Sequence, residues 1–457
     1  MNIHIPELVS KQRQYFQSGR TLDAEFRLAM LRKLREALRG AEPKLRRALH
    51  ADLGKSEAEA YMSELGPTLA ELSHAIRSLP KWAKPRKVRT PVALIGSRGF
   101  IMPEPYGSAL IIAPWNYPVF LSLPPLIGAI AAGNCAVLKP SELAPHTSQA
   151  LRELIGGTFP ESYVAVVEGE ANVSQALLRE KFDYVFFTGS TAIGKKVLEA
   201  AAAHLTPATL ELGGKSPCIV HGDADIGLAA RRIAWGKTLN AGQTCVAPDY
   251  VLVQRGIKRH FLDALRTEVE RQSRNAAGDA PPRIVNERHL RRLAALLEGQ
   301  DQRIVCGGRY DAQRLSFEPT LLDEPDPASP VMQEEIFGPI MPVLAYDELE
   351  DALRFVRERP KPLALYVFTS SRGVERETLG RLSFGGGCVN DTVLHLSSPY
   401  LPFGGVGASG IGSYHGQASF ETFSHHKSVL RQTTRFDLPF RYAPGKRTLR
   451  LLRRLFK

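Results

Sequence analysis

Cys245 lies in the stretch LNAGQTCVAPDY, residues 239–250, among small polar residues and glycine. A free thiol buries like a small hydrophobe, so a structural cysteine usually has Val, Leu and Ile around it. Cys245 instead stands in a predicted turn that follows a helical stretch, IGLAARRIAWGKTLNAG. A thiol in such a place can act as a nucleophile, although an ordinary loop cysteine fits the same pattern.

Two other side chains could assist a nucleophile. Glu211, in TLELGGKSPCIV, stands at the end of a predicted strand beside a glycine turn. Partial burial there would raise its pKa and suit a general base, while an edge-strand salt bridge is the alternative. Asn116 lies between the two prolines of IIAPWNYPVF. A rigid amide of this kind could be an oxyanion-hole donor, although Asn is also common in turns.

The stretch FFTGSTAIGKK, residues 186–196, has a strand, a glycine turn and a helix in the order of a phosphate site. It nearly fits a P-loop, but Lys196 stands where Ser or Thr would bind magnesium, and Thr191 breaks the G-x-G-x-x-G pattern. The N–H groups that follow Gly189 and Ser190 could still bind a pyrophosphate. A nucleotide site and a structural strand–helix turn fit this pattern about equally.

Composition limits the class of protein. At 457 residues, with 44% hydrophobic and 23% charged residues, the chain predicts a soluble protein of two or three domains. The net charge is +12, but nine Arg or Lys and one Asp in residues 431–457 contribute +8 of it, which argues against nucleic acid as a partner. The five cysteines are odd in number and scattered, which favours a reduced, cytoplasmic location without disulfides or a Cys-rich zinc site.

The pattern of elements predicts an α/β fold. Residues 1–80 have the apolar spacing of helices. Two later series then alternate short β-branched runs with helical segments, which is typical of doubly wound parallel sheets. The first series contains SALIIAP, CAVLKP, YVAVVEG and YVFFTG, and the second contains SPCIV, DYVLVQ, PTLL and LALYVFTS.

Seven motifs occur in a recognisable order: PWNYP, LKPSE, FTGSTAIGK, ELGGKSP, GQTC, EEIFGP and PFGGVGASGIGSYHG. Over roughly residues 20–430 the chain resembles the aldehyde dehydrogenase superfamily. The short N-terminus and the GSYHG ending resemble its class 3 branch of fatty, aromatic and coniferyl aldehyde dehydrogenases. The resemblance implies that Cys245 is the nucleophile, that Asn116 and the Cys245 N–H hold the oxyanion, and that Glu211 activates water to hydrolyse a thioester.

The same resemblance implies a nicotinamide cofactor and no metal. A carboxylate at Glu142 would accept the adenosine ribose hydroxyls and disfavour a 2′-phosphate, whereas Lys139 favours one, so we expect NAD and leave NADP open. The cofactor-binding residues carried over from the family are Trp115, Lys139, Glu142, Thr188, Gly189, Ser190, Gly194, Glu335 and Phe337. The histidines, His425 and His426 included, lack a credible metal-ligand set.

The expected organisation is two doubly wound α/β domains with a β-strand oligomerisation arm that forms a homodimer. Residues 1–87 and 108–212 would bind NAD, residues 213–412 would form the catalytic domain, and residues 88–107 and 413–433 the arm. In the arm, 88–107 and 420–432 have strand-like alternation. Residues 434–457 form a basic amphipathic tail. The tail could contact an anionic membrane surface or pack on the enzyme itself.

The substrate predicted from the sequence is an aromatic or a medium- to long-chain aliphatic aldehyde. In the resembled family Tyr117 and the loop 390–402 line the substrate channel, and this loop is apolar and contains no arginine to pair a substrate carboxylate. Two alternatives stay open at this stage. One is a CoA-acylating or phosphorylating relative, against which the Glu211 match argues. The other is a non-catalytic basic binding protein on the same scaffold.

Overall fold

The computed structural model describes residues 4–275 and 282–437, together with five isolated positions near the C-terminus: Tyr442, Gly445, Leu449, Arg450 and Arg453. Apart from residues 434–437 and these five positions, the predicted amphipathic tail lies outside the described residues. Within the described ranges, none of the helices has the length and apolar character needed to cross a membrane.

The N-terminal region is helical, as predicted. Leu31, Leu34 and Leu38 recur at helical spacing and are buried. Asp23 caps the long helix at its N-terminus, and Gly54 ends it in a left-handed conformation with φ +68°. The helices are α1 (Ile5–Gln17), α2 (Ala24–Leu53), α3 (Glu57–Ala60), the π-helical turn η2 (Tyr61–Leu65) and α4 (Gly66–Trp82).

The first α/β domain contains a six-stranded sheet in the order β17-β7-β6-β3-β4-β5. Five strands run parallel: β3 (Ser108–Ile112), β4 (Cys135–Lys139), β5 (Val164–Val166), β6 (Tyr184–Thr188) and β7 (Ala208–Glu211). The connecting helices are α5 (Leu123–Ala132), α6 (Pro145–Thr158), α7 (Ala171–Arg179) and α8 (Thr191–Ala202). All four strands predicted for this series are confirmed.

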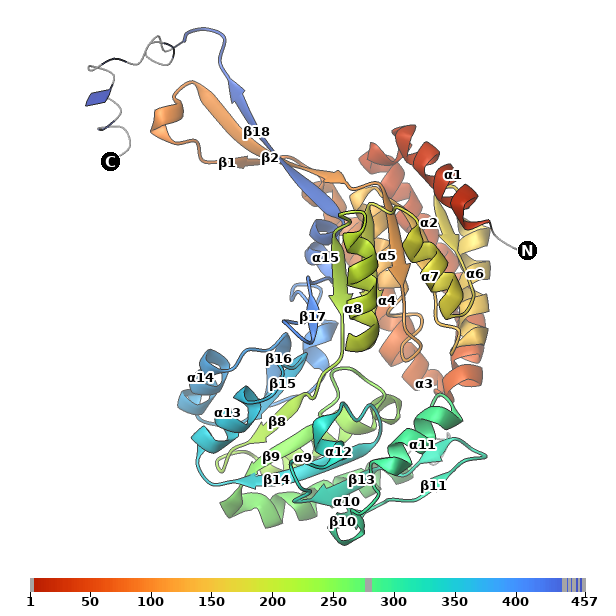
Figure 1. Ribbon diagram of the computed structural model, residues 1–457, viewed down its shortest axis with the longest axis vertical. Coiled ribbons are helices and arrows are strands. Elements are labelled where there is room, and N and C mark those ends of the chain that lie inside the picture. The colour runs from red at the N-terminus through yellow and green to blue at the C-terminus, as the bar shows by residue number, and fades with distance from the viewer. Residues whose placement is uncertain are drawn as a thin grey trace.

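The second α/β domain, lower in Figure 1, contains a seven-stranded sheet in the order β10-β13-β14-β9-β8-β15-β16. Its strands are β8 (Pro217–Val220), β9 (Tyr250–Gln254), β10 (Ile304–Cys306), β13 (Thr320–Asp323), β14 (Ile340–Tyr346), β15 (Ala364–Phe368) and β16 (Gly386–Val389). Its helices are α9 (Ile226–Thr238), α10 (Lys258–Asn275), α11 (Glu287–Ala295), α12 (Pro330–Gln333), α13 (Leu349–Arg357) and α14 (Arg372–Arg381). A separate hairpin pairs β11 (Tyr310–Asp311) with β12 (Ser316–Phe317). Two doubly wound domains are therefore present.

A three-stranded antiparallel sheet projects from the two domains at the upper left of Figure 1. It contains β1 (Arg86–Val88), β2 (Ser97–Pro105) and β18 (Ser424–Gln432), and β18 pairs with β2 along its whole length. The strand expected from residue 420 begins only at Ser424, because residues 416–422 form helix α15 (Gly416–Thr422). Phe420 and Phe423 are buried, and α15 packs against α4 and α5 of the first domain.

One strand departs from the expected domain boundary at residue 412. Strand β17 (Gly410–Ile411) pairs antiparallel with β7 and so extends the sheet of the first domain, although the chain around it was assigned to the second. Gly410 pairs with Glu211, and its φ of +152° together with a close approach to the Leu210 carbonyl leaves no room for a Cβ. A contact between residues this far apart in the sequence leaves no trace in the local sequence pattern.

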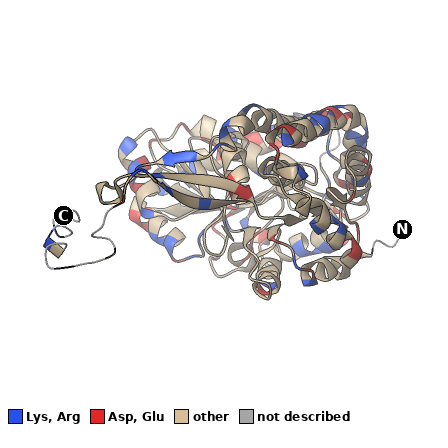
Figure 2. Ribbon diagram, turned by 90° about the horizontal axis from the view of Figure 1, so that it is seen from above, with Lys and Arg blue, Asp and Glu red and all other residues tan. Residues whose placement is uncertain are grey.

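Charged side chains are dispersed over the described part of the molecule. Figure 2 shows Lys and Arg interspersed with Asp and Glu along the ribbon. Several of these charges pair within one helix, such as Arg291 with Glu287 and Arg381 with Glu377. The distribution is that of a solvated surface and differs from the single basic face of a nucleic-acid-binding protein.

Candidate active site

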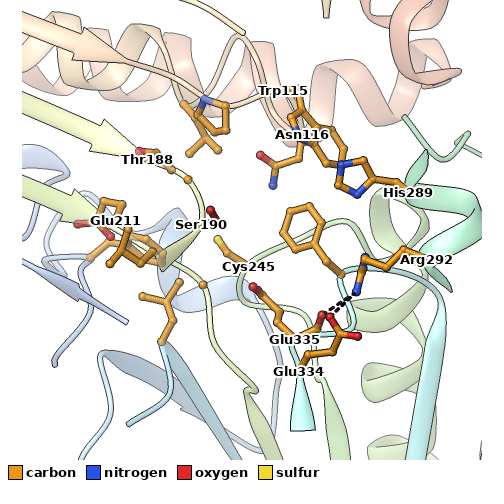
Figure 3. A pocket seen from close by; sticks show the side chains of 18 of the residues that line it. Trp115, Asn116, Thr188, Ser190, Glu211, Cys245, His289, Arg292, Glu334 and Glu335 are labelled. Atoms are coloured by element: carbon orange, nitrogen blue, oxygen red, sulfur yellow. Dashed lines mark hydrogen bonds and ion pairs between the residues drawn. The ribbon is translucent and has the colours of Figure 1, made fainter. Parts of the chain in front are cut away.

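A cavity of about 330 Å³ lies where the carboxyl ends of β3, β6 and β7 face the second domain (Figure 3). Ligands of doubly wound sheets bind at this edge. Most of the predicted site residues line it together: Trp115, Asn116, Thr188, Gly189, Ser190, Glu211, Cys245, Glu335 and Phe337. The structure thus brings these five segments of the chain into one site.

The Cys245 loop owes its shape to an unusual turn after α9. Asn240 and Ala241 both have φ +53°, and Gly242 follows with φ +72°. A Cβ at Gly242 would lie 2.3 Å from the Gly338 carbonyl oxygen, so only glycine fits there. This backbone turns the chain sharply at the end of the helix and presents the thiol to the cavity.

The Cys245 thiol is protonated at neutral pH in this environment. Burial raises the pKa of Cys245 to about 12, and the nearby carboxyl groups of Glu335 and Glu211 add to the effect. The backbone N–H groups of Cys245 and Val246 oppose it only in part. Reaction at the sulfur therefore requires a group that accepts its proton.

Glu211 is the last residue of β7 and lies between β6 and β17. Both of its carboxyl oxygens are buried and have no hydrogen-bond partner among the described residues. The edge-strand salt bridge that the sequence left open does not occur there. Burial raises the pKa of Glu211 well above its usual value. A buried carboxyl group that has no partner among the described residues, on a residue that lines the cavity, has the properties of a general base.

The Asn116 side chain is fixed by hydrogen bonds at both ends of the residue. Its amide nitrogen donates to the Gln243 carbonyl oxygen at 3.0 Å, and its backbone oxygen accepts from the Asn240 amide at 2.8 Å. Figure 3 shows the Asn116 amide and the Cys245 sulfur pointing into the same space. An amide has two N–H groups, and the bond to Gln243 uses one of them, so the other can serve the cavity.

The cavity lining also contains polar atoms, from both domains, that have no hydrogen-bond partner among the described residues. Glu335 Oε1 and Thr188 Oγ1 are buried without a hydrogen-bond partner in the described residues. Burial, with Asp249 nearby, raises the pKa of Glu335 to about 8. A Cβ at Gly213 would lie 2.1 Å from Glu335 Oε2, so glycine makes room for this carboxyl. Ser190 lies two residues after Thr188 and caps α8, and the free N–H groups of a helix N-terminus attract phosphate.

Three predicted cofactor residues do not line the cavity. Lys139, at the end of β4, forms an ion pair with Glu142 at 2.6 Å. Gly194 is buried in α8, where a Cβ would lie 2.6 Å from a methyl group of Leu212. Gly194 therefore allows close packing of the helix on the sheet. Within the described ranges, no cluster of His, Cys, Asp and Glu is suited to a metal ion.

Two residues of the second domain that line the cavity have no motif in the sequence that marks them. His289 and Arg292 lie on α11, and Arg292 donates to the Glu335 backbone oxygen at 3.2 Å and pairs with Glu334 at 3.4 Å (Figure 3). Arg292 thereby holds the segment that carries Glu335. Their separation by three residues places both on one helix face, which was the only available signal.

A second cavity, of about 150 Å³, is also lined by Cys245. It contains no Asp, Glu, Lys or Arg among its lining residues, and burial lowers the pKa of His415 to about 3, so that ring is neutral. Its side chains are mainly apolar: Met62, Pro67, Tyr117, Phe120, Leu121, Trp235, Leu239, Val246, Val393, Leu394, Leu396, Phe403 and Tyr414. Cys245 thus lies at the junction of two cavities of different character.

Comparisons with known proteins agree with this arrangement. Residues 3–429 match the aldehyde dehydrogenase family. The chain is 46% identical to the 4,4′-diaponeurosporen-aldehyde dehydrogenase of Staphylococcus aureus over 100% of both chains. It is 43% identical to the dimeric, NADP-preferring aldehyde dehydrogenase of Rattus norvegicus over 93% of this chain and 94% of that one.

A solved structure of Staphylococcus aureus AldH in a substrate-bound state superposes with a TM-score of 0.96, at 45% identity and with 100% of both chains covered. Two Rossmann-like domains, a projecting strand arm and a thiol at their junction define an oxidoreductase of one known architecture. The protein belongs to the aldehyde dehydrogenase family, and aldehyde dehydrogenase activity follows from that membership.

Proposed function

We propose that this enzyme oxidises an apolar aldehyde to the carboxylic acid through a thioester on Cys245, with NAD or NADP as the oxidant. The position of Cys245 carries the proposal. Cys245 lines both the cavity that contains the unpartnered carboxyl oxygens of Glu211 and Glu335, here called the polar cavity, and the apolar cavity. Cofactor and substrate can approach the sulfur from opposite sides.

In the first step the Cys245 sulfur attacks the aldehyde carbon. A carbon–sulfur bond forms, and the carbonyl π electrons move to the oxygen. The free Asn116 N–H and the Cys245 backbone N–H hold the resulting oxyanion. The thiol proton passes to a neighbouring carboxylate, for which the raised pKa values of Glu211 and Glu335 make both groups suitable.

The polar cavity fits a nicotinamide cofactor. The unpartnered Glu335 Oε1 and Thr188 Oγ1 would accept or donate hydrogen bonds to it, Phe337 and Trp115 would bound it with their rings, and Ser190 at the start of α8 would lie by its phosphates. When bound, NAD(P) accepts the hydride that leaves the former aldehyde carbon. Lys139 and Glu142 would contact the adenosine ribose, and Gly194 would keep α8 close to the sheet beneath it.

Hydrolysis of the thioester is the proposed task of Glu211. As a carboxylate it takes a proton from a water molecule, whose oxygen attacks the acyl carbon and expels the Cys245 sulfur as a thiolate. The thiolate regains a proton, so the thiol is restored and the acid leaves. Among the described residues that line the polar cavity, Glu211 is the one in which both carboxyl oxygens are buried without a hydrogen-bond partner.

The substrate class proposed from the apolar cavity is an aromatic or a medium- to long-chain aldehyde. We expect decanal and coniferaldehyde to exceed succinic semialdehyde in kcat/KM by at least about 100-fold, because burying an unpaired carboxylate costs several kcal/mol. Initial rates of cofactor reduction across this panel, with NAD and with NADP, measure it.

A matched pair of variants sharpens the same test. Leu396→Asp introduces a charge into the apolar cavity and should lower kcat/KM for decanal at least about tenfold. Leu379→Asp makes the same change at an exposed position on α14 and should leave kcat/KM for decanal unchanged. A preference for succinic semialdehyde would contradict the proposed substrate class. Formation of acyl-CoA instead of the acid, with CoA present, would favour the CoA-acylating alternative.

We further propose that the arm joins two copies of the chain into a homodimer. Strand β18 is one of the two edge strands of the three-stranded sheet, and most of its side chains are exposed. Val92, Ile95 and Leu430 are exposed on the same arm, and an edge strand with apolar neighbours is suited to pairing. Sedimentation at micromolar concentration should give a dimer, and a stable monomer would contradict the proposal. A cytoplasmic location, with peripheral membrane contact through residues 434–457, stays a proposal from the sequence.

A further inference from the structure

A fully buried ion pair lies behind the site without lining either cavity. Lys55 follows α2, and Glu64 lies in the π-helical turn η2. Their side chains have 0% exposed surface, and Lys55 Nζ is 2.6 Å from Glu64 Oε1. Removing two charges from water is expensive, and a buried pair is often no more stable than apolar residues in its place. We therefore expect the buried Lys55–Glu64 pair to have a role other than stabilising the fold.

Both side chains of this pair reach the loop that carries Asn116. Lys55 Nζ donates to the Asn116 backbone oxygen at 3.0 Å and lies 4.0 Å from the centre of the Tyr117 ring. Glu64 Oε2 accepts from the backbone N–H groups of Val119 at 2.8 Å and Phe120 at 3.0 Å. Lys55 and Glu64 thus hold the loop by hydrogen bonds to residues before and after Tyr117 in the sequence.

The same helical region also holds the loop that carries the thiol. Glu59 Oε1 accepts from the Asn240 N–H at 2.8 Å. The Asn240 side chain then donates to the Asn116 backbone oxygen at 2.8 Å, so this oxygen accepts from both Asn240 and Lys55. The Asn116 amide in turn donates to the Gln243 carbonyl, two residues before the thiol. The network therefore joins the oxyanion donor to the nucleophile.

We propose that Lys55 and Glu64 are positioning residues that set the Asn116 amide at its working distance from the Cys245 sulfur. This inference rests on the proposed roles of Asn116 and Cys245. A donor stabilises an oxyanion only where it lies at hydrogen-bond distance from the oxygen that develops charge, so a small shift of the loop is enough to lower the rate. Neither residue touches the cavities, so cofactor binding should not depend on them.

The test is a double-mutant cycle. Lys55→Met with Glu64→Gln removes both charges, keeps an acceptor for the Val119 and Phe120 N–H groups, and keeps an apolar stem over Tyr117. We expect kcat to fall about tenfold to thirtyfold, with KM for NAD(P) within twofold of the parent. In an Asn116→Ala background the same pair of changes should lower kcat less than twofold, because the group through which it acts is gone.

Two further variants control this cycle. Lys55→Arg keeps the charge but has a longer, planar donor, and should lower kcat about fivefold without loss of folding. Lys258→Met with Glu324→Gln removes a partly exposed ion pair that lines neither cavity, and it should leave kcat unchanged. In this pair Lys258 Nζ is 2.7 Å from Glu324 Oε1, which also accepts from the Ala345 N–H at 2.9 Å. Equal losses with and without Asn116, or unchanged kcat in the Lys55 variants, would overturn the inference. If the parent reduces no cofactor with any aldehyde, the proposed function itself fails.

Discussion

Replacement of Cys245 by serine is expected to lower kcat for aldehyde oxidation by about 10⁴-fold or more, while the affinity for NAD(P) stays within about threefold. The same burial and neighbouring carboxyl groups that raise the pKa of the thiol to about 12 would act on a hydroxyl whose pKa is already much higher. The alkoxide would then be inaccessible at neutral pH. The side chain differs by one atom, so the fold and the cofactor cavity should be preserved.

The measurement is the steady-state rate of cofactor reduction with decanal, together with cofactor binding by fluorescence titration. Cys306→Ser is the matched control, because Cys306 is a free, half-buried cysteine on β10 that lines neither cavity. It should keep full activity. A Cys245→Ser variant with activity within tenfold of the parent would remove Cys245 from the proposed mechanism.

Replacement of Glu211 by glutamine should separate acylation from hydrolysis. Glutamine has the same shape but cannot accept a proton from water, so turnover should fall about 10²- to 10³-fold. Acylation can proceed with Glu335 as the proton acceptor. Mixing the variant with substrate should then give a rapid burst of reduced cofactor, close to one per active site, before a slow steady state. Steady turnover at the parent rate without a burst would mean that another group activates the water.

The pH dependence provides an independent check on the same residue. Burial raises the pKa of Glu211, so its carboxylate fraction grows as the pH rises, and the parent's hydrolysis rate should rise with it. The Glu211→Gln variant should lose this rise. Hydroxylamine, which attacks a thioester without a general base, should restore turnover in the variant. If it does not, the slow step is not the release of a thioester.

Local patterns in the sequence determined the elements and their chemistry. Alternation of β-branched runs with helical segments predicted the strands β3, β4, β6, β8, β9 and β15, because a parallel sheet covered on both faces needs continuous apolar strands. The turn at Gly242 and the glycine turn beside Glu211 could also be predicted from the sequence, because glycine marks backbone conformations that other residues rarely adopt. The motifs around Asn116, Glu211 and Cys245 carried the resemblance to the family.

Contacts between distant segments decided the rest. Strand β17 reaches β7 across about two hundred residues of chain, and α11 brings Arg292 to the segment of Glu335, although neither contact has a local signal. The Lys55–Glu64 pair looks like two ordinary surface charges in the sequence, where Lys and Glu are almost never fully buried. Only the packing of η2 against the Asn116 loop removes both from water. Propensity and periodicity act over a few residues, whereas burial and pairing depend on which surfaces meet, and that is settled by the tertiary structure.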